Sequence, residues 1–273
     1  LTEALPYIQK FSKKICIVKY GGAAMIEESL KNSFARDITL MKQVGINVAV
    51  VHGGGPQIDK ELEKSNIKRN FIDGIRVTDK ETIEIVSNTL DGIINKEIVD
   101  LINKNGGNSI GVAKDKKGTI SVEKLTTENI DYGYVGKVVN VNSNYLYELM
   151  NSNYIPVIAP LGYDSSGQVY NINADTAASQ IASHLSAEKL IFLTDTQGVN
   201  DDKGNLISTL NSKEIKNFIE SDIIRGGMLP KINASLEAVS KSVKTAHIID
   251  GRIQHSVLLE IFTNDGIGTL VKK

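Results

Sequence analysis

Short, uninterrupted apolar runs alternate with stretches of helical periodicity along most of this chain. The runs are 15–18 (ICIV), 46–51 (INVAVV) and 189–193 (KLIFL). The first two are rich in β-branched residues, and each of the three is followed by a polar residue. Continuous rather than alternating apolar runs are typical of parallel strands that helices cover on both faces. The pattern therefore predicts an α/β fold built on parallel strands.

The segments between these runs carry apolar residues at helical spacing. Helices are expected at about 30–41, 78–105, 146–150, 176–185, 232–239 and 257–261, and further β segments at 71–77, 154–159, 246–249 and 268–271. The stretch 108–142 has short β-like runs separated by polar turns, so we expect hairpins there. Thr78-Asp79 should cap the long helix that follows it.

The segment before the first strand has its own helical pattern. Leu5, Ile8 and Phe11 lie at helical spacing, and Pro6 falls within a first turn, where proline is tolerated. Such a short amphipathic helix has no evident core to join. Two interpretations remain open: the helix docks on another subunit, or it packs on its own domain as an ordinary arm.

Composition places the chain among ordinary globular proteins. With 273 residues, 41% hydrophobic and 23% charged, it can form one large domain or two lobes that share a core. The formal net charge of -1 and the lack of a long basic run argue against nucleic acid as a partner. No apolar run is long enough to span a membrane, and the first residues lack the apolar core of a signal peptide. We therefore expect a cytoplasmic protein, or one of the plastid stroma if the source is an alga or plant.

Two glycine-rich loops follow predicted strands. Lys19 ends the first strand and precedes Gly21 and Gly22, and Gly53–Gly55 follows the second strand before a helix begins. Ligands of open α/β sheets bind beyond the carboxyl ends of the strands, where backbone N–H groups and helix N-termini can hold an anion. The first loop alone is equally consistent with a plain turn after a solvated lysine. Three consecutive glycines favour close approach of a ligand, because a simple turn rarely needs them all.

Several common signatures are missing. The chain has no GxxxxGK[ST], no protein-kinase motifs, no GxGxxG, no HExxH, no paired cysteines and no GxSxG. What remains are the glycine loops, Lys19, Lys231, Arg76 and Asp175. That set suits phosphoryl transfer, in which the protein mainly positions the reactants and neutralises charge. A carboxylate nucleophile, already ionised near neutral pH, would need no catalytic base.

The motifs KYGGAAM, VVHGGGP, DGIRVTD, NINADTAA, FLTDTQGV and GGMLPK occur in this order over nearly the whole chain. Together they resemble the amino-acid kinase family, and within it the arginine-sensitive enzymes that phosphorylate N-acetyl-L-glutamate. The resemblance implies a three-layer αβα sandwich with a central, mainly parallel eight-stranded sheet. It also implies a helical arm at 1–12, an N-terminal lobe at 13–172 for acetylglutamate binding and dimerisation, and an ATP-binding C-terminal lobe at 173–273.

The activity implied by the resemblance is ATP-dependent phosphorylation of the γ-carboxylate of N-acetyl-L-glutamate in arginine biosynthesis. The catalytic residues would be Lys19, Lys231 and Asp175; the substrate-binding residues Gly54, Gly55, Arg76, Asn171 and Asn173; and the ATP-binding residues Gly21, Gly22, Asp195 and Gly198. Asp175 would orient both lysines, or serve as a helix N-cap, or do both. Mg2+ would bind mainly through the nucleotide phosphates, so no protein ligand is named for it.

Regulation and assembly are further expectations from the resemblance. Arginine would bind at Tyr7, His255, Glu260, Gly266 and Gly268, and the arms would link three dimers into a homo-hexamer. In cyanobacterial and plastid relatives the signalling protein PII binds this ring, which makes PII a candidate partner. Two alternatives stay open: a sister kinase acting on another small carboxylate, and a catalytically idle member that only binds ligands.

Overall fold

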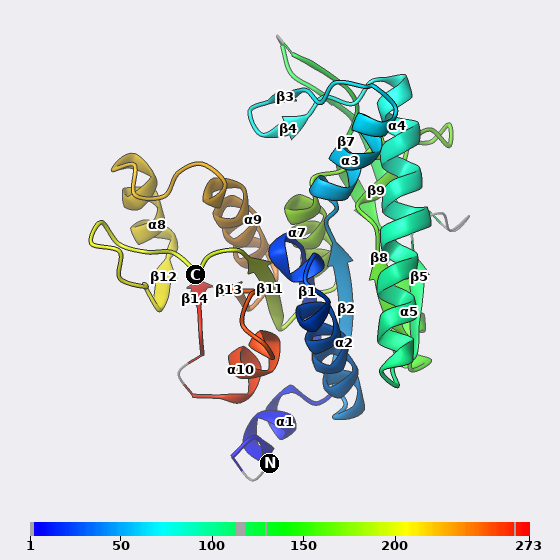
Figure 1. Cartoon of the computed structure of the whole chain (residues 1–273). Helices are drawn as coiled ribbons and strands as arrows, with labels where there is room; N and C mark the ends of the chain where they lie inside the picture. The colour runs from blue at the N-terminus through cyan, green and yellow to red at the C-terminus, as the bar shows by residue number, and fades with distance from the viewer. Residues whose placement is uncertain (1–2, 113–117, 129, 265) are drawn as a thin grey trace.

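Eight strands form one central sheet in the computed structural model, which describes residues 3–112, 118–128, 130–264 and 266–273 (Figure 1). In spatial order they are β12 (Thr209–Asn211), β14 (Thr269–Lys272), β13 (Thr245–Asp250), β11 (Lys189–Thr194), β1 (Ile15–Tyr20), β2 (Asn47–His52), β8 (Ile155–Ile158) and β5 (Ser109–Val112). Every neighbouring pair is parallel except β13 and β14. The expected α/β fold with a mainly parallel sheet is confirmed.

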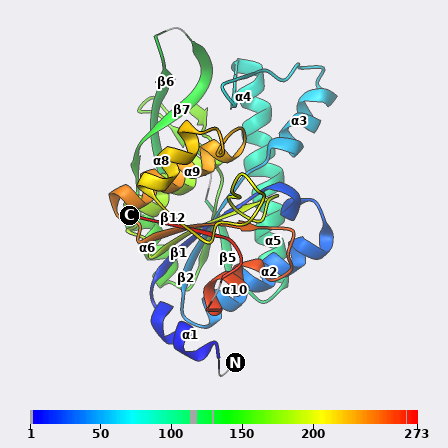
Figure 2. The same cartoon turned by 90° about the vertical axis from the view of Figure 1, so that its left-hand side faces the viewer.

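Helices cover both faces of this sheet (Figure 2). One face, called here the α7 face, packs against α6 (Ser143–Asn151), α7 (Ala174–His184), α8 (Ser212–Glu220) and α9 (Met228–Lys241). The other, the α2 face, packs against α1 (Leu5–Phe11), α2 (Glu28–Gln43), α3 (Gly55–Lys64), α4 (Lys80–Ser87), the π-helix η2 (Asn88–Asn95), α5 (Lys96–Lys104) and α10 (Ser256–Phe262). Within the described residues, no helix is both long and apolar enough to cross a membrane.

Alternation along β1 decides which side chains reach which face. Val18 and Tyr20 belong to the core of the α2 face, where the Tyr20 ring stacks on Phe34 of α2 at 3.7 Å between centroids. Ile17 belongs to the core of the α7 face. Because successive strand residues point to opposite faces, Lys19 shares the side of Ile17. The strand therefore directs the Lys19 ammonium toward α7 and α9.

Smaller β elements lie beside the main sheet. The strands β6 (Ile120–Thr126), β7 (Asp131–Val141), β9 (Leu161–Tyr163) and β10 (Val169–Asn171) close into a barrel, and β3 (Phe71–Ile72) pairs with β4 (Ile75–Arg76). The hairpin expectation for 108–142 is confirmed for β6 and β7, apart from residues 113–117 and 129, which lie outside the described residues. It is wrong for β5, which pairs in parallel with β8 at the sheet edge. Its partner strand begins at Ile155, and local pattern cannot reveal so distant a pairing.

The long helix expected at 78–105 is present but is not uniform. Asp79 caps it by accepting a hydrogen bond from the Thr82 N–H at 2.8 Å. The middle third, η2, is π-helical, while α4 and α5 on either side are α-helical. Apolar spacing did not predict the π segment, because it shifts the helical period only slightly. Hydrophobic periodicity also left α8, β9, β10 and β12 unpredicted.

The N-terminal helix α1 packs on its own chain. Phe11 is buried in the core of the α2 face, and the Tyr7 hydroxyl donates a hydrogen bond to the side chain of Asn264. Leu5 nevertheless keeps 49% of its surface exposed. The local interpretation therefore holds for the end of the helix next to β1, while Leu5, at the start of the apolar stripe, is only half covered by the described residues of this chain.

Gly133 of β7 packs against Thr78, two residues after Arg76, and a substitution there tests this packing. Its φ is +73°, and a Cβ added there would lie 2.1 Å from the Thr78 carbonyl oxygen. We expect Gly133→Ala to lower the free energy of unfolding by roughly 2–5 kcal/mol, from left-handed strain plus overpacking. Gly167→Ala, with φ +84° but open space around it, should lose only the strain of about 1–2 kcal/mol. Urea unfolding measures both, and equal losses would contradict this account.

Candidate functional site

Three adjacent loops meet at the carboxyl ends of the parallel strands. Because β11, β1 and β2 are parallel neighbours, the loops after them emerge side by side. The Gly53 N–H donates to the Tyr20 carbonyl at 2.8 Å, and the Asp195 Oδ1 accepts from the Ala23 N–H at 2.6 Å. These bonds join the glycine loop after β1 to its neighbours on both sides.

A cavity of about 370 Å³ lies at these strand ends, and its volume suits a small polar ligand. Among its lining residues are Lys19, Gly21, Gly22, Gly54, Gly55, Arg76, Asn171, Asn173 and Asp175. All the residues expected to bind substrate thus surround one space with two of the three expected catalytic residues. Lys231, Asp195 and Gly198 are not part of the cavity wall.

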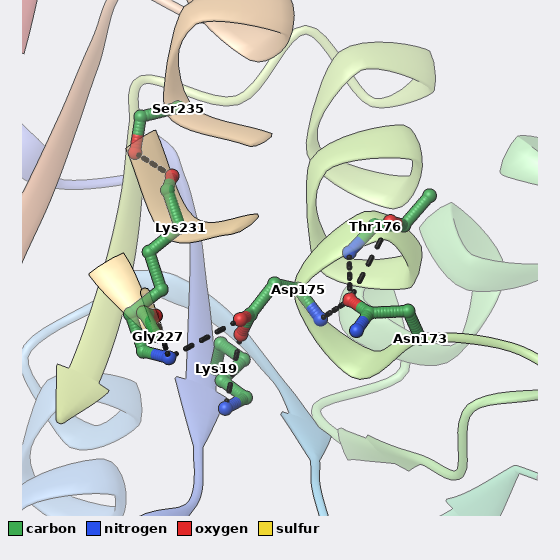
Figure 3. Close-up of polar contacts among 7 residues, drawn as sticks. All are labelled: Lys19, Asn173, Asp175, Thr176, Gly227, Lys231 and Ser235. Carbon is green, nitrogen blue, oxygen red and sulfur yellow. Dashed lines mark hydrogen bonds and ion pairs between the residues drawn. The ribbon is translucent and has the colours of Figure 1, made fainter. Parts of the chain in front are cut away.

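Lys231 reaches the site through Asp175 (Figure 3). The Asp175 Oδ1 lies 3.0 Å from the Lys19 Nζ, and the Asp175 Oδ2 lies 3.4 Å from the Lys231 Nζ. The three side chains come from β1, α7 and α9, and Asp175 keeps only 6% of its surface exposed. One buried carboxylate in the cavity wall therefore holds two ammonium groups, of which Lys19 also lines the cavity.

Charge balance keeps the Asp175 carboxylate ionised. Burial by itself raises the pKa of Asp175, but the charges and hydrogen bonds of Lys19 and Lys231 outweigh it and bring the pKa below its usual range. With both lysines protonated, the three groups carry one net positive charge. Such a group can neutralise an anion without first taking up a proton.

The cap of α7 frees Asp175 for this role. The Asn173 Oδ1 accepts from the Asp175 N–H at 2.9 Å and from the Thr176 N–H at 3.0 Å (Figure 3). The alternative expectation that Asp175 caps the helix is therefore wrong, because Asn173 occupies that position. Asn173 still lines the cavity, but its carbonyl oxygen is committed to the helix.

Lys231 stands on a helix rather than in the loop before it. The pattern placed 226–231 ahead of the helix, but α9 begins at Met228, so Lys231 lies in its first turn. Its Nζ is 3.4 Å from the Gly227 carbonyl oxygen, at the start of that turn. The two glycines before α9 thus bring the helix start, and with it Lys231, up to Asp175.

Arg76 presents part of its guanidinium to the cavity. Its Nη2 lies 2.5 Å from the Asp59 Oδ1, and its Cζ sits 4.5 Å from the Phe71 ring centroid. The Nη1 is buried and has no hydrogen-bond partner among the described residues. A buried donor without a partner is costly, so a hydrogen-bond acceptor that reached this atom would be stabilised. Sequence reasoning missed Asp59, because one carboxylate on an amphipathic helix carries no distinctive signal.

The remaining expected ligand residues differ in their surroundings. The Asn171 amide donates to the Thr78 Oγ1 at 3.4 Å and faces the cavity. A Cβ on Gly22 would lie 2.3 Å from the Asp195 Oδ1, so the glycine loop needs that residue to be small. Gly198, by contrast, is packed against Thr269 beside the last strand, and the structure gives it a turn-forming position away from the cavity.

The residues expected to bind arginine lie around α10. The Glu260 Oε1 is 2.6 Å from the His247 Nδ1, and its Oε2 accepts from the Ile267 N–H at 2.7 Å. A Cβ on Gly266 would come within 2.9 Å of that carboxylate, and one on Gly268 would strike the Ile248 carbonyl oxygen at 2.2 Å. Glu260 is thus already paired.

Tyr7 and His255 lie near opposite ends of this helix. Tyr7 bonds Asn264, just beyond the end of α10. The His255 Nδ1 contacts the Asp37 Oδ1 at 2.6 Å, at the start of α10. The five residues therefore surround α10, but the structure does not gather all of them at one point.

Comparison with known sequences identifies the family. The sequence model of the amino acid kinase family matches residues 14–250. The chain belongs to the amino acid kinase family. The acetylglutamate kinase of Nitrosococcus oceani is 50% identical over 284 residues, which cover 100% of this chain and 94% of that protein. That of Thermoanaerobacter pseudethanolicus is 52% identical over 276 residues, which cover 100% and 92%.

The fold of this amino acid kinase also occurs in solved structures. N-acetylglutamate synthase from Neisseria gonorrhoeae, complexed with coenzyme A and N-acetyl-glutamate, superposes with a TM-score of 0.89 at 24% identity. The match covers 100% of this chain and 62% of that one. At this identity the likeness shows a shared fold alone. It agrees with the three-layer arrangement of helices around a parallel sheet.

The side chains of this amino acid kinase also bear on its metal. Within the described ranges, no three His, Cys, Asp or Glu side chains gather as a ligand set. Kinases that use ATP work with a divalent metal, and Mg2+ commonly binds through phosphates, waters and at most one or two carboxylates.

The pKa of Asp175 gives a test of the charge arrangement. Because its folded-state pKa lies below its unfolded value, its stabilising effect is complete above about pH 5 and is lost as the pH falls through the folded pKa. Asp175→Asn should therefore cost on the order of 2 kcal/mol at pH 7, less than for a fully buried pair because Lys231 is partly exposed. The difference should shrink below about pH 4. Thermal unfolding from pH 3 to 7 measures it, and a pH-independent difference would contradict the assignment.

Proposed function

We propose that this amino acid kinase transfers the γ-phosphoryl group of ATP to the γ-carboxylate of N-acetyl-L-glutamate, a step of arginine biosynthesis. The observation that carries the proposal is the Lys19–Asp175–Lys231 group, with its buried carboxylate, beside a cavity that Arg76 also lines. Relatives named acetylglutamate kinase, about half identical over the whole chain, support the same substrate. Those relatives are bacterial, so we infer a cytoplasmic enzyme rather than a plastid one.

The reaction requires little covalent help from the protein. A γ-carboxylate oxygen of the acceptor attacks the γ-phosphorus, and the bond from that phosphorus to the bridging oxygen of ADP breaks. Lys19 and Lys231 stabilise the charge on the transferred group from two sides, while Asp175 keeps both ammonium groups in place. The backbone N–H groups of Gly22, Gly54 and Gly55 add further donors around the phosphates and the reacting carboxylate.

Acceptor recognition would depend on Arg76 and Asn171. A guanidinium matches a carboxylate in geometry and charge, so the unpaired edge of Arg76 suits the α-carboxylate of acetylglutamate. The Asn171 amide suits the acetamido group. We assign the acceptor to the lobe 13–172 and ATP to the lobe 173–273. The sheet order supports this division, because β1, β2, β8 and β5 form one half and β11, β13, β14 and β12 the other.

The nucleotide side is proposed to include Gly21, Gly22 and Asp195. Asp195 lies against the Gly21–Gly22 loop on the side of β11, next to the proposed path of the phosphates. Gly198 would act only through the shape of its turn. Mg2+ bound to the nucleotide would neutralise phosphate charge and draw electrons from the leaving group.

Regulation by arginine is proposed at the corner between α1 and α10. Tyr7, Glu260, Gly266 and Gly268 would contribute there, with His255 fixing the start of the helix. Because Glu260 is paired with His247, a guanidinium would have to share or replace that contact. The exposed apolar start of α1 supports docking of the arm on a second dimer, giving a hexamer built from three dimers. PII remains a candidate partner of that ring.

Two other functions have distinct signatures. A sister kinase would phosphorylate free glutamate, aspartate or another small carboxylate in preference to N-acetylglutamate. An idle member of the family would bind ligands without turnover. The presence of Lys19, Asp175 and Lys231 together argues against the idle alternative, because charge clusters of this kind beside a cavity are typical of active sites.

Trapping of the acyl phosphate tests the reaction and both lysines. With N-acetylglutamate, MgATP and hydroxylamine, the protein should produce a hydroxamate. Lys19→Ala and Lys231→Ala should each lower kcat by on the order of 100-fold or more, since each removes charge from the transition state. Lys216→Ala on the exposed surface of α8 is the matched control. A signal with free glutamate or aspartate but not with N-acetylglutamate would refute the substrate, and an unchanged kcat would remove that lysine from the mechanism.

Arg76→Lys tests the division between the two substrates. It keeps the charge but loses the planar fork that pairs with a carboxylate. We expect KM for N-acetylglutamate to rise by about tenfold or more, with KM for ATP changed by less than about twofold. Steady-state kinetics with each substrate varied in turn measures this split. A selective loss of ATP affinity would mean that the two lobes are assigned the wrong way round.

Shortening the arm tests assembly and regulation. Removal of residues 1–8 leaves Phe11, which belongs to the core, in place. We expect dimers that retain activity and are much less sensitive to arginine, as judged by light scattering and by assays with added arginine. Leu5→Glu should weaken the hexamer in the same way, whereas Val139→Glu, also at an exposed apolar position, should not. A shortened protein that stayed hexameric and fully sensitive would refute the role of the arm.

A further inference from the structure

The π-helix η2 packs directly against the triple-glycine loop. A Cβ placed on Gly54 would lie 2.5 Å from the Ile94 Cδ1 and 2.8 Å from the Leu90 Cδ2. Both side chains are buried, and Leu90 also lines the cavity. Segments of π-helix are rare and occur often at functional sites. Leu90 and Ile94 of this segment pack against Gly54.

The last residue of the π-helix also reaches the loop, through a hydrogen bond. Asn95 is buried, and its Nδ2 lies 2.9 Å from the Val157 carbonyl oxygen and 3.1 Å from the His52 Nε2. A carbonyl oxygen can only accept, so the contact with Val157 fixes which end of the amide is the nitrogen. The same NH2 group then donates to the His52 Nε2. A Cβ on Gly111 would lie 2.2 Å from the Asn95 Oδ1, so β5 keeps a glycine beside this amide.

These contacts determine the tautomer of His52. Since Nε2 accepts a hydrogen bond, the single ring proton of the neutral imidazole must be on Nδ1. The Nδ1 lies 2.9 Å from the Gly53 carbonyl oxygen, to which it donates. The side chain is completely buried, and burial lowers the pKa of His52 to about 4. The ring therefore stays neutral, with its proton on Nδ1, throughout the neutral pH range.

The bond to Gly53 sets the direction of the next backbone donor. The Gly53–Gly54 peptide is trans, so its C=O and N–H groups point in opposite directions. His52 shares the side of the sheet with Val48 and Val50, whose side chains belong to the core of the α2 face. A carbonyl held toward this buried imidazole turns the Gly54 N–H away from the core of the α2 face, and Gly53, Gly54 and Gly55 all line the cavity.

We propose that His52 is a positioning residue, held by Asn95 of the π-helix, that aims the Gly54 N–H at the anionic groups in the cavity. The chain of contacts runs from Val157 through Asn95 and His52 to the Gly53 carbonyl, while Leu90 and Ile94 support the Gly54 Cα. The inference rests on the proposed function in one respect: the anion is taken to be the transferred phosphoryl group or the carboxylate that receives it. The arrangement of the loop does not depend on which anion is bound.

Two substitutions at His52 separate positioning from packing. The Asn side chain places an N–H donor near the position of Nδ1, so His52→Asn keeps a bond to the Gly53 carbonyl and loses the contact with Asn95. His52→Gln places an acceptor near the position of Nε2, so it keeps the contact with Asn95 and loses the bond to Gly53. Both remove the ring, and Gln, one methylene longer than Asn, fills more of the space that the ring leaves. We nevertheless expect kcat of the Gln variant to fall about tenfold below that of the Asn variant, with unchanged KM for ATP, so better packing cannot explain the order of the two variants. Equal kcat values, or a faster Gln variant, would overturn the proposal.

A spectroscopic measurement on the unmodified protein serves as the second test and needs no activity. Histidine 15N NMR of the whole chain should show the His52 proton on Nδ1 and a bare Nε2, unchanged from about pH 6 to 9. A proton on Nε2 overturns the proposal even if neither variant folds. If the unmodified protein forms no acyl phosphate from N-acetylglutamate, the proposed function fails, whereas this tautomer measurement still decides the role of His52.

Discussion

The pairing of one buried carboxylate with two lysines is the interaction on which the site depends. Asp175 lies between Lys19 of β1 and Lys231 of α9, and it ties together a central strand and two helices of the α7 face. Two ammonium groups at this spacing would repel each other in a partly buried site without a counter-charge. Asp175 removes that repulsion while leaving an excess of positive charge. The arrangement stabilises the structure and suits the anionic reactants proposed above.

The parallel sheet makes this pairing possible. The carboxyl ends of its central strands lie side by side, so loops from distant parts of the sequence meet there. Strand alternation directs Lys19 to the same face as α7 and α9. The opposite face supports the glycine loop through η2 and His52. Each face of the sheet thus contributes a different function to one cavity. The α7 face supplies Asp175 and Lys231, and the α2 face packs against the backbone of the glycine loop.

Much of this could be predicted from the sequence. Apolar runs such as 46–51 specified buried parallel strands, and the glycines after Lys19 and His52 specified loops that approach a ligand. Local signals of this kind are readable because they depend on neighbouring residues: strand burial, helix caps and glycine turns are all short-range. The order of the motifs also showed the family resemblance, which pointed to Lys19, Asp175, Lys231 and Arg76. The structure brings these four residues together at the carboxyl ends of the strands.

The tertiary structure alone decided the partners of these residues. Nothing local indicates that Asp59 pairs with Arg76, that β5 joins the sheet edge beside β8, or that Asn95 fixes the proton on His52. Each is a contact between segments separated along the chain, chosen by packing and by the need to satisfy buried polar groups. The π-helical conformation of η2 also could not be predicted from apolar spacing. In the structure this segment packs against the glycine loop. The sequence determined the elements and the chemical groups, while long-range packing determined which groups meet, because burial energies depend on the whole fold.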